Sequence, residues 1–227
     1  MGDELKIAAI ITEYKERGFL EEAYASVINQ TRKPDIIAIL KKEPQEKDKN
    51  FIGQLFYYEE DHYGKMLYKV INSIDADVYS FLDDDDKWLP KKIEYVEKVF
   101  QDPDVVFYRN RNSDKTFINS DKTFKIPVGN LSSQSIRKMP NLYKLTYFST
   151  IVDIAIYLIA LENTDKKMIV DDETKEVLTY YRRHQGNYSI TDQFRKERDS
   201  ILIQMPNWFT GKAKEYAEFI KKRDYGN

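Results

Sequence analysis

The chain of 227 residues contains no cysteine and only two histidines. Neither disulfides nor thiolate metal sites can form, which excludes disulfide scaffolds and zinc-finger-like modules. A chain without cysteine fits a reducing compartment, so we expect a cytoplasmic protein. Lysine and glutamate are plentiful, and that composition favours a thermophilic source.

The chain also lacks an excess of positive charge and a long uninterrupted apolar run. Its net charge is −2 and its pI is near 5.9, which gives no support for a nucleic-acid partner. The apolar segment 142–161 contains Lys144 and Asp153. A carboxylate at mid-bilayer costs about 2.5–3.5 kcal/mol, so we expect no transmembrane span. Residues 1–6 lead directly into a predicted strand and do not resemble a signal peptide.

What is present is the composition of a globular α/β protein, with 41% hydrophobic and 33% charged residues. Short apolar, β-branched runs predict buried strands, and apolar residues at helical spacing predict helices between them. This order predicts a mainly parallel sheet covered on both faces. The predicted strands are 5–11, 36–40, 55–58, 78–82 and 105–108, and the predicted helices are 19–30, 64–74 and 91–100.

The second half of the chain is less regular. Its longest apolar helix is predicted at 143–161, short strands are predicted at 168–170 and 177–181, and amphipathic helices at 192–222. The near duplicates 114–117 and 121–124 predict a small hairpin rather than a repeat architecture.

Four consecutive aspartates, Asp83 to Asp86, follow the predicted strand 78–82, and Pro90 then opens the next helix. The carboxylates therefore lie at the carboxyl end of a strand, the edge at which open α/β sheets bind ligands. Four adjacent negative charges are tolerated if a cation neutralises them, and oxygen ligands suit Mg²⁺ or Mn²⁺ bridging to substrate phosphates. The alternative is a solvated acidic loop.

Several stretches together resemble a family 2 glycosyltransferase of the nucleotide-sugar-dependent GT-A class. They are Ile10-Ile-Thr-Glu-Tyr14, Phe19 to Thr31, Phe81 to Pro90, and Tyr180-Tyr-Arg-Arg-His-Gln-Gly-Asn-Tyr-Ser189, and the resemblance covers residues 5–101 and 148–189. It implies a Rossmann-like, mainly parallel sheet with helices on both faces, plus C-terminal helices. The implied organisation is a GT-A domain over 1–191, with a nucleotide- and metal-binding half (1–101) and an acceptor half (102–191), followed by a helical extension over 192–227.

The resemblance also implies roles for individual residues. A divalent cation, Mn²⁺ or Mg²⁺, would be held by Asp85, Asp86 and His184. Asp83 and Asp84 would hold the ribose or order the loop, and Arg182 would pair with phosphate oxygens. The alternative for His184 is a surface or structural residue, and the alternative for Arg182 is an exposed charge on a strand.

Further residues are matched to the nucleotide-sugar site and to the catalytic base. Thr12, Glu13 and Tyr14 form the nucleotide loop, where Tyr14 would stack on the base or else pack in the core. Lys65, after a glycine at a helix start, would reach the base or the diphosphate. Asp153 matches the base of an inverting transfer, and its alternative is a structural carboxylate bonded to backbone.

Three departures from the family pattern leave the nucleotide base open. The second strand ends at Lys41 and Lys42, where the family has an aspartate that bonds the base. An arginine common in the family's next helix is missing near Leu67, and the usual asparagine after Tyr14 is Lys15.

The sequence thus predicts an inverting, metal-dependent glycosyltransferase that moves a sugar from a nucleotide-diphosphate sugar to a glycan, lipid or protein acceptor. One alternative is a non-catalytic nucleotide- or carbohydrate-binding protein of the same fold, which the altered motifs favour. Another, a nucleotidyltransferase, would need a Gly- and Arg-rich phosphate loop that the first loop lacks.

The C-terminal segment mixes aromatic residues, including Trp208 and Phe209, with lysines. Such helices pack on their own domain, form a homodimer or partner interface, or lie peripherally on an anionic membrane. Packing or self-association is the simpler interpretation, and acidic residues in the segment weaken any membrane attraction.

Overall fold

The computed structural model describes residues 5–13, 16–113, 130–170, 176–184 and 192–225. The strands are β1 (Ile7–Glu13), β2 (Ile36–Lys41), β3 (Gln54–Tyr57), β4 (Val78–Asp83), β5 (Lys87–Trp88), β6 (Val105–Arg109), β7 (Arg111–Asn112), β8 (Gln134–Arg137), β9 (Lys167–Val170) and β10 (Val177–Tyr180). The α-helices are α1 (Leu20–Ile28), α2 (Tyr63–Ser73), α3 (Lys92–Phe100), α4 (Val152–Leu161), α5 (Asp192–Gln204) and α6 (Gly211–Tyr225). Short 3₁₀ helices are η1 (Glu46–Asn50), η3 (Leu131–Ser133), η4 (Pro140–Tyr147) and η6 (Met205–Trp208).

Seven strands form the central sheet, in the order β3-β2-β1-β4-β8-β6-β9. The first four are parallel, β8 is antiparallel to both of its neighbours, and β9 is parallel to β6. Because β1 lies between β2 and β4, the carboxyl ends of these three strands meet at one edge of the sheet. The predicted mainly parallel sheet is confirmed.

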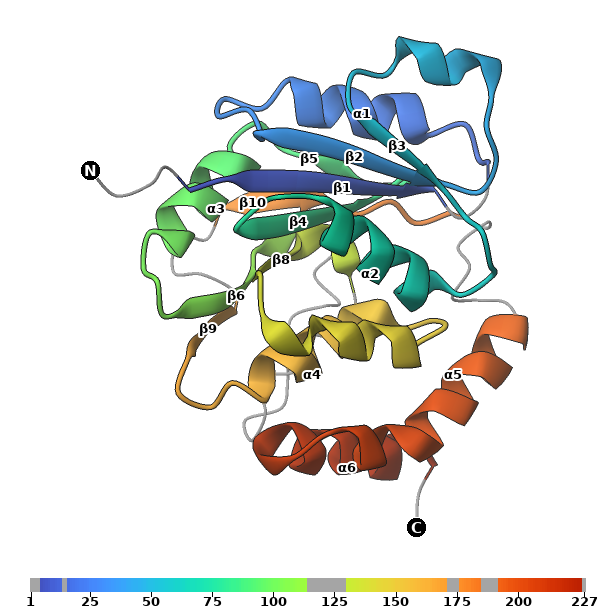
Figure 1. Ribbon diagram of the computed structural model, residues 1–227, viewed down its shortest axis with the longest axis vertical. Coiled ribbons are helices and arrows are strands. Elements are labelled where there is room, and N and C mark those ends of the chain that lie inside the picture. Colours follow the sequence, from blue (N-terminus) through green and yellow to red (C-terminus); the bar gives the residue numbers. More distant parts are fainter. Residues whose placement is uncertain (1–4, 14–15, 114–129, 171–175, 185–191, 226–227) are drawn as a thin grey trace.

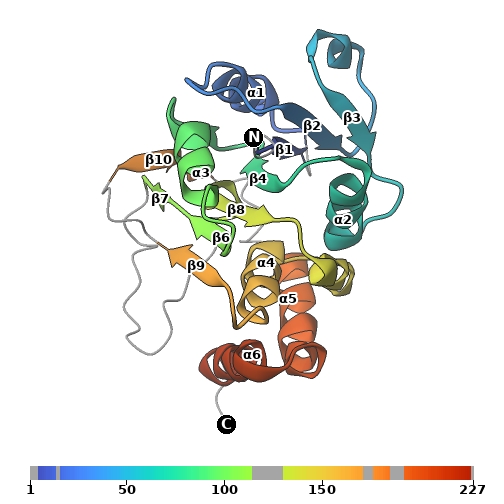
Figure 2. The same cartoon turned by 60° about the vertical axis from the view of Figure 1, so that its left-hand side comes forward.

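Alternating side chains along the strands build two apolar layers, one on each face of the sheet. Helices cover both faces (Figures 1 and 2). On one face, Ile7, Ala9 and Ile11 of β1 pack with α1 and α3. On the other, Ala8 and Ile10 pack with α2, α4 and the C-terminal helices. The predicted helices on both faces are therefore confirmed, and the carboxyl edge of the sheet opens between the two layers.

A smaller sheet, β5-β10-β7, lies beyond that edge. Strand β10 pairs antiparallel with β5, through Thr179 opposite Trp88 and Tyr180 opposite Lys87. Since β5 directly follows the four aspartates, this pairing carries residues 181–184 back to them. It explains how a segment about 100 positions later in the sequence reaches the loop after β4.

The helix predicted over 143–161 is not continuous. The 3₁₀ helix η4 ends at Tyr147, and α4 begins only at Val152. Between them, Ile151 adopts a left-handed backbone conformation with φ 49°. The apolar spacing was read as one helix because both pieces bury apolar residues of similar type, and the break lies within the apolar run.

Strand β8 was not predicted. Its four residues include one apolar side chain, Ile136, so no strand pattern is visible in the sequence. The strand is nevertheless central, and the hydroxyls of Ser80 and Ser135 lie 2.8 Å apart across it. The predicted hairpin over 114–124 lies outside the described residues.

The C-terminal helices pack on the same face of the sheet as α4 (Figure 1). The Tyr216 ring lies 5.1 Å from the Tyr157 ring of α4, and the Trp208 ring lies 5.2 Å from Phe148. The packing interpretation of this segment is therefore confirmed for its aromatic residues. Within the described ranges, no helix is long and apolar enough to cross a bilayer.

Candidate active site

Strand β4 delivers the aspartate loop to the carboxyl edge of the sheet. Its first five residues are buried, and Asp83, its last, lies beside Thr12 in the register with β1. The Thr12 hydroxyl donates to Asp83 Oδ1 at 3.1 Å and lies 2.8 Å from the Tyr63 hydroxyl. Since Thr12 donates to Asp83, its oxygen accepts from Tyr63. Two elements thus hold the first aspartate in place.

The aspartate loop is buried, so the solvated-loop interpretation is wrong. Asp84, Asp85 and Asp86 are 1%, 7% and 1% exposed. Burial raises the pKa of Asp84 to about 7 even though the Arg17 guanidinium opposes the shift. Burial and the Asp85 charge raise the pKa of Asp86 to about 7, and burial with the three neighbouring carboxylates holds the pKa of Asp83 well above its usual range. Such a cluster favours cation binding.

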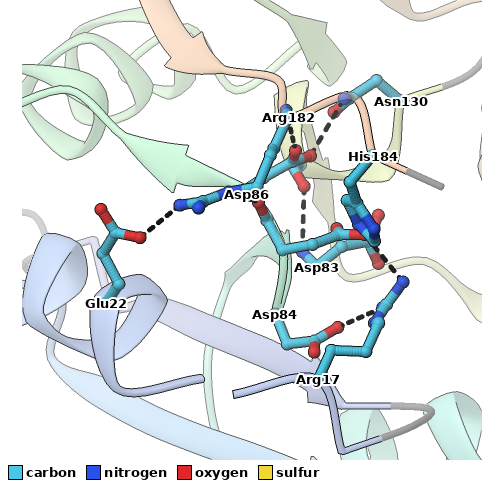
Figure 3. A network of polar contacts seen from close by, with 10 residues as sticks. Arg17, Glu22, Asp83, Asp84, Asp86, Asn130, Arg182 and His184 are labelled. Atoms are coloured by element: carbon cyan, nitrogen blue, oxygen red, sulfur yellow. Dashed lines mark hydrogen bonds and ion pairs between the residues drawn. The ribbon is translucent and has the colours of Figure 1, made fainter. Parts of the chain in front are cut away.

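Arg17 supplies positive charge to the loop (Figure 3). Its guanidinium bridges two carboxylates, with Nη2 2.6 Å from Asp84 Oδ1 and Nη1 2.8 Å from Asp85 Oδ2. Sequence reasoning missed this residue, because its partners lie 67 positions away or more. The available signal was an arginine in the short loop between a buried strand and the following helix.

His184 and Asp85 come together as the family resemblance implied. His184 Nε2 lies 2.9 Å from Asp85 Oδ2, and the ring of Phe19 lies 5.3 Å from the imidazole. His184 is therefore partly buried and in contact with the loop, and its metal role stays a prediction. The imidazole and the carboxylate converge on the same side of the loop as Arg17 (Figure 3).

Asp86 is directed into the protein instead. Its Oδ1 accepts from the backbone N–H of Arg182 at 2.9 Å, and its Oδ2 accepts from the Asn130 amide at 3.1 Å. The Arg182 side chain donates through Nε to the Asp85 carbonyl at 2.9 Å and pairs with Glu22. These contacts tie the end of β10 to the aspartate loop, so Asp86 and Arg182 shape the site.

Among the described residues, no three His, Asp or Glu side chains gather as a metal site. The predicted trio of Asp85, Asp86 and His184 is therefore not assembled, because Asp86 is turned toward Arg182 and Asn130. The pair Asp85 and His184 does fit a divalent cation, since such ions in phosphate-binding sites commonly take one or two protein ligands and complete their shell with phosphate oxygens and water. The guanidinium of Arg17 binds the same carboxylate oxygen as His184, Asp85 Oδ2.

Asp153 lies in the first turn of α4, immediately after the left-handed Ile151. A β-branched residue at positive φ is strained by an energy on the order of 1–3 kcal/mol, and such strain clusters at functional sites. Burial raises the pKa of Asp153, and backbone N–H groups at the helix start oppose the shift. Burial is also the main cause of the raised pKa of Tyr63, and the charges of both Asp83 and Asp153 add to it.

Other predicted residues stand apart from the loop. Lys65 pairs with Glu60 at 2.9 Å on a half-exposed surface of α2. Gly64 serves packing there, because a Cβ at that position would lie 2.0 Å from the Leu145 carbonyl oxygen. Tyr14 lies outside the described residues. Glu13 is buried at the end of β1, beside Lys41 in the register with β2.

Comparisons with known proteins bear on the fold. No family model matches the chain. An uncharacterized glycosyltransferase of Nostoc sp. is 29% identical over 112 residues, which is 45% of this chain and 35% of that protein. The chain thus spans about a third of the length of this curated relative.

Solved structures are similar over nearly the whole chain. A mannosyltransferase of Pyrobaculum calidifontis, in complex with GDP-Man and Mn²⁺, has a TM-score of 0.68 at 14% identity, over 97% of this chain and 70% of that one. TarS residues 1–349 of S. aureus with UDP-GlcNAc gives 0.66 at 12%, over 97% and 73%. Glucosyl-3-phosphoglycerate synthase of Mycobacterium tuberculosis, with Mn²⁺, UDP and phosphoglyceric acid, gives 0.62 at 10%, over 92% and 80%. The chain has the fold of the GT-A glycosyltransferases.

Proposed function

We propose that this chain is an inverting glycosyltransferase that moves a sugar from a nucleotide-diphosphate sugar to an acceptor hydroxyl. The observation that carries the proposal is the buried aspartate loop at the carboxyl edge of the sheet, with His184 in contact with Asp85. Asp153, in the first turn of α4 after the left-handed Ile151, is the proposed base. The fold shared with nucleotide-sugar enzymes supports the proposal.

Each group has a chemical task in this proposal. Asp85 and His184 would hold Mn²⁺ or Mg²⁺, which as a Lewis acid stabilises charge on a departing diphosphate. Asp83, fixed by Thr12, would bind the donor's ribose. Asp153 would accept the proton of the acceptor hydroxyl, and its raised pKa brings it closer to the operating pH of a general base.

A second candidate is a donor-binding protein without transferase activity. Arg17 favours it, because the guanidinium already neutralises Asp84 and Asp85 without a metal ion. In that case a nucleoside diphosphate would bind with no dependence on Mn²⁺ and no turnover.

One experiment separates the two functions. The protein is incubated with nucleotide-sugar donors and Mn²⁺, and release of nucleoside diphosphate is followed with and without an acceptor mixture of glycans and lipids. NMR of the product then gives the anomeric configuration. Inversion at the anomeric carbon supports the proposal. Tight donor binding with no sugar transfer or hydrolysis, in a folded protein, would support the second candidate.

A further inference from the structure

A second buried ionic cluster lies at the ends of β1 and β2, on the α1 side of the sheet. Glu13 and Lys41 are register partners there. The Lys41 ammonium is fully buried, pairs with Asp48, and lies 3.6 Å from Glu13 Oε2. The Tyr57 hydroxyl donates to Asp48 Oδ2 at 3.1 Å. Lys41 and Asp48 therefore form an ion pair whose charged groups have close partners, while Glu13 lies farther from the ammonium than Asp48 does.

Glu13 is less well satisfied than Asp48. It is 3% exposed, and within the part of the chain that the structure describes its Oε1 accepts no hydrogen bond. A buried carboxylate oxygen without a donor costs free energy, since it has lost water and gained nothing. Burial accordingly raises the pKa of Glu13 despite the nearby lysine. An orphaned acceptor of this kind is explained if a ligand supplies the donor.

The position of Glu13 is that of a donor-site residue. It follows Thr12, whose hydroxyl donates to Asp83 and whose carbonyl oxygen accepts from the backbone N–H of Asp84 at 3.0 Å. The sequence has Lys41 where an aspartate would be expected to bond the nucleotide base. The structure has a carboxylate at this edge, that of Glu13. It lies on the neighbouring strand β1, 3.6 Å from the Lys41 ammonium.

We propose that Glu13 reads the nucleotide base of the donor and selects guanine. This rests on the proposed function, which requires a nucleotide donor. An ionised carboxylate can only accept, and it needs N–H groups on the base edge. Guanine presents a ring N–H beside an amino group. Uracil presents one ring N–H between two carbonyl oxygens, which a carboxylate repels. Adenine and cytosine present a ring nitrogen lone pair, which it also repels.

The expected preference for GDP over UDP follows from the number of hydrogen bonds that the Glu13 carboxylate makes with each base. Pairing a carboxylate with two donors in place of one discriminates between bases by about 1–3 kcal/mol, as bidentate base contacts do in other complexes. That energy corresponds to a preference of about 5- to 150-fold for GDP over UDP. ADP and CDP would bind more weakly still, because the unpaired carboxylate then faces a lone pair.

Calorimetric titration of the full chain with GDP, UDP, ADP and CDP, in the presence of Mn²⁺, tests this. The wild type is expected to bind GDP most tightly, and Glu13→Gln to lose most of that preference while keeping its thermal melting behaviour. Glu43→Gln, an exposed carboxylate just after β2, is the matched control and should behave as wild type.

The outcomes separate the two proposals. UDP binding as tightly as GDP in the wild type would overturn the base assignment while leaving the glycosyltransferase proposal intact, and so would an unchanged preference in a folded Glu13→Gln. If Glu13→Gln does not fold, the wild-type order of affinities still decides. Absence of binding by all four nucleotides would reject both proposals.

Discussion

Two ionic groups in this molecule, both largely removed from water, are built in opposite ways. Glu162, at the end of α4, receives two hydrogen bonds of 2.7 Å from Lys144, and the backbone N–H of Thr210 donates to its Oε1 at 3.0 Å. The ammonium of Lys144 also donates to the Trp208 carbonyl at 2.9 Å. Every charge in this pair has a partner, and the pair fastens η6 to α4.

The aspartate loop has more negative charge than its partners satisfy. Arg17 is the cation that bridges two of its carboxylates, and Asp84 Oδ2 has no hydrogen-bond partner among the described residues. Burial of a carboxylate without full compensation is unfavourable, as the raised pKa values of Asp84 and Asp86 show. The difference teaches that burial alone does not mark a functional carboxylate. Incomplete satisfaction of the carboxylates distinguishes the aspartate loop from the Glu162–Lys144 pair, and a bound cation would supply the missing partner.

The largest effect is expected for a substitution of Asp153, the proposed general base. Asp153→Asn should lower sugar transfer by a factor of about 10²–10⁴, since the acceptor proton would lose its base. Nucleoside diphosphate binding should stay unchanged. Transfer rates and binding titrations on the same preparation check both. Near-normal transfer by a folded variant would reject the assignment, and loss of folding would identify Asp153 as a structural carboxylate.

The Glu162–Lys144 pair, whose charges all have partners, should affect the free energy of unfolding and not ligand binding. Glu162→Ala leaves a nearly buried ammonium without its partner, so the free energy of unfolding should fall by about 3–5 kcal/mol. Glu46→Ala, in an exposed pair with Lys49, should cost about 0–1 kcal/mol. Urea denaturation measures both variants. A change in the Mn²⁺ dependence of nucleotide binding in Glu162→Ala would contradict the distinction between the two ionic groups.

Because its buried carboxylates lack full compensation, the aspartate loop should make the free energy of unfolding depend on pH. Asp84 and Asp86 have folded pKa values of about 7 against an ordinary 3.8, so the folded state holds protons that the unfolded state releases. Their contribution to stability is complete below about pH 4 and is lost as the pH rises through about 7, a change of roughly 4 kcal/mol for each group. Urea titrations of the metal-free protein across that range measure it. Asp84→Asn should flatten the slope, and an equal slope in both proteins would disprove this account.

Removing the proposed metal ligand should abolish the effect of the metal. Asp85→Ala should bind a nucleoside diphosphate equally with and without Mn²⁺, where the wild type gains about tenfold, equal to 1.4 kcal/mol. Asp165→Ala, an exposed aspartate, is the control. Metal-dependent affinity at the wild-type level in Asp85→Ala would remove the loop from the metal site.

The smallest effect concerns Arg17. Because its guanidinium already pairs with Asp84 and Asp85, a cation must compete with it. Arg17→Met should therefore bind Mn²⁺ a few-fold more tightly in the absence of nucleotide, while Arg198→Met, altered in a surface pair with Asp199, should not. Weaker Mn²⁺ binding by Arg17→Met would show that the arginine supports the cation site.

The sequence predicted those parts of the fold that depend on local pattern. The runs that became β1 and β4 are apolar and β-branched, and Asp83 to Asp86 follow one of them directly. His184 was matched to the loop through a motif, and its contact with Asp85 is observed. The metal role of this pair and the catalytic role of Asp153 stay predictions.

What the sequence did not predict depends on contacts between distant segments. The polar strand β8 exists because β4 and β6 bury its serine and glutamine, Ser135 and Gln134, between them. Arg17 pairs with Asp84 and Asp85, two carboxylates that only folding brings near it. The break before α4 comes from a single backbone angle at Ile151, and no periodicity in an apolar run records it.

Gly64 has a consequence for how the two halves of the site are aligned. Its backbone N–H donates to the Phe148 carbonyl at 2.9 Å, and no side chain separates α2 from the segment leading into α4. The contact between the main chain of α2 and that of the segment leading into α4 therefore limits how closely Tyr63 and Asp153 approach each other. One added methyl group on Gly64 would push the segment leading into α4 away from α2. A shift of about 1 Å in such an alignment can cost about 100-fold in rate, so the smallest side chain in the chain sets the tolerance of the whole site.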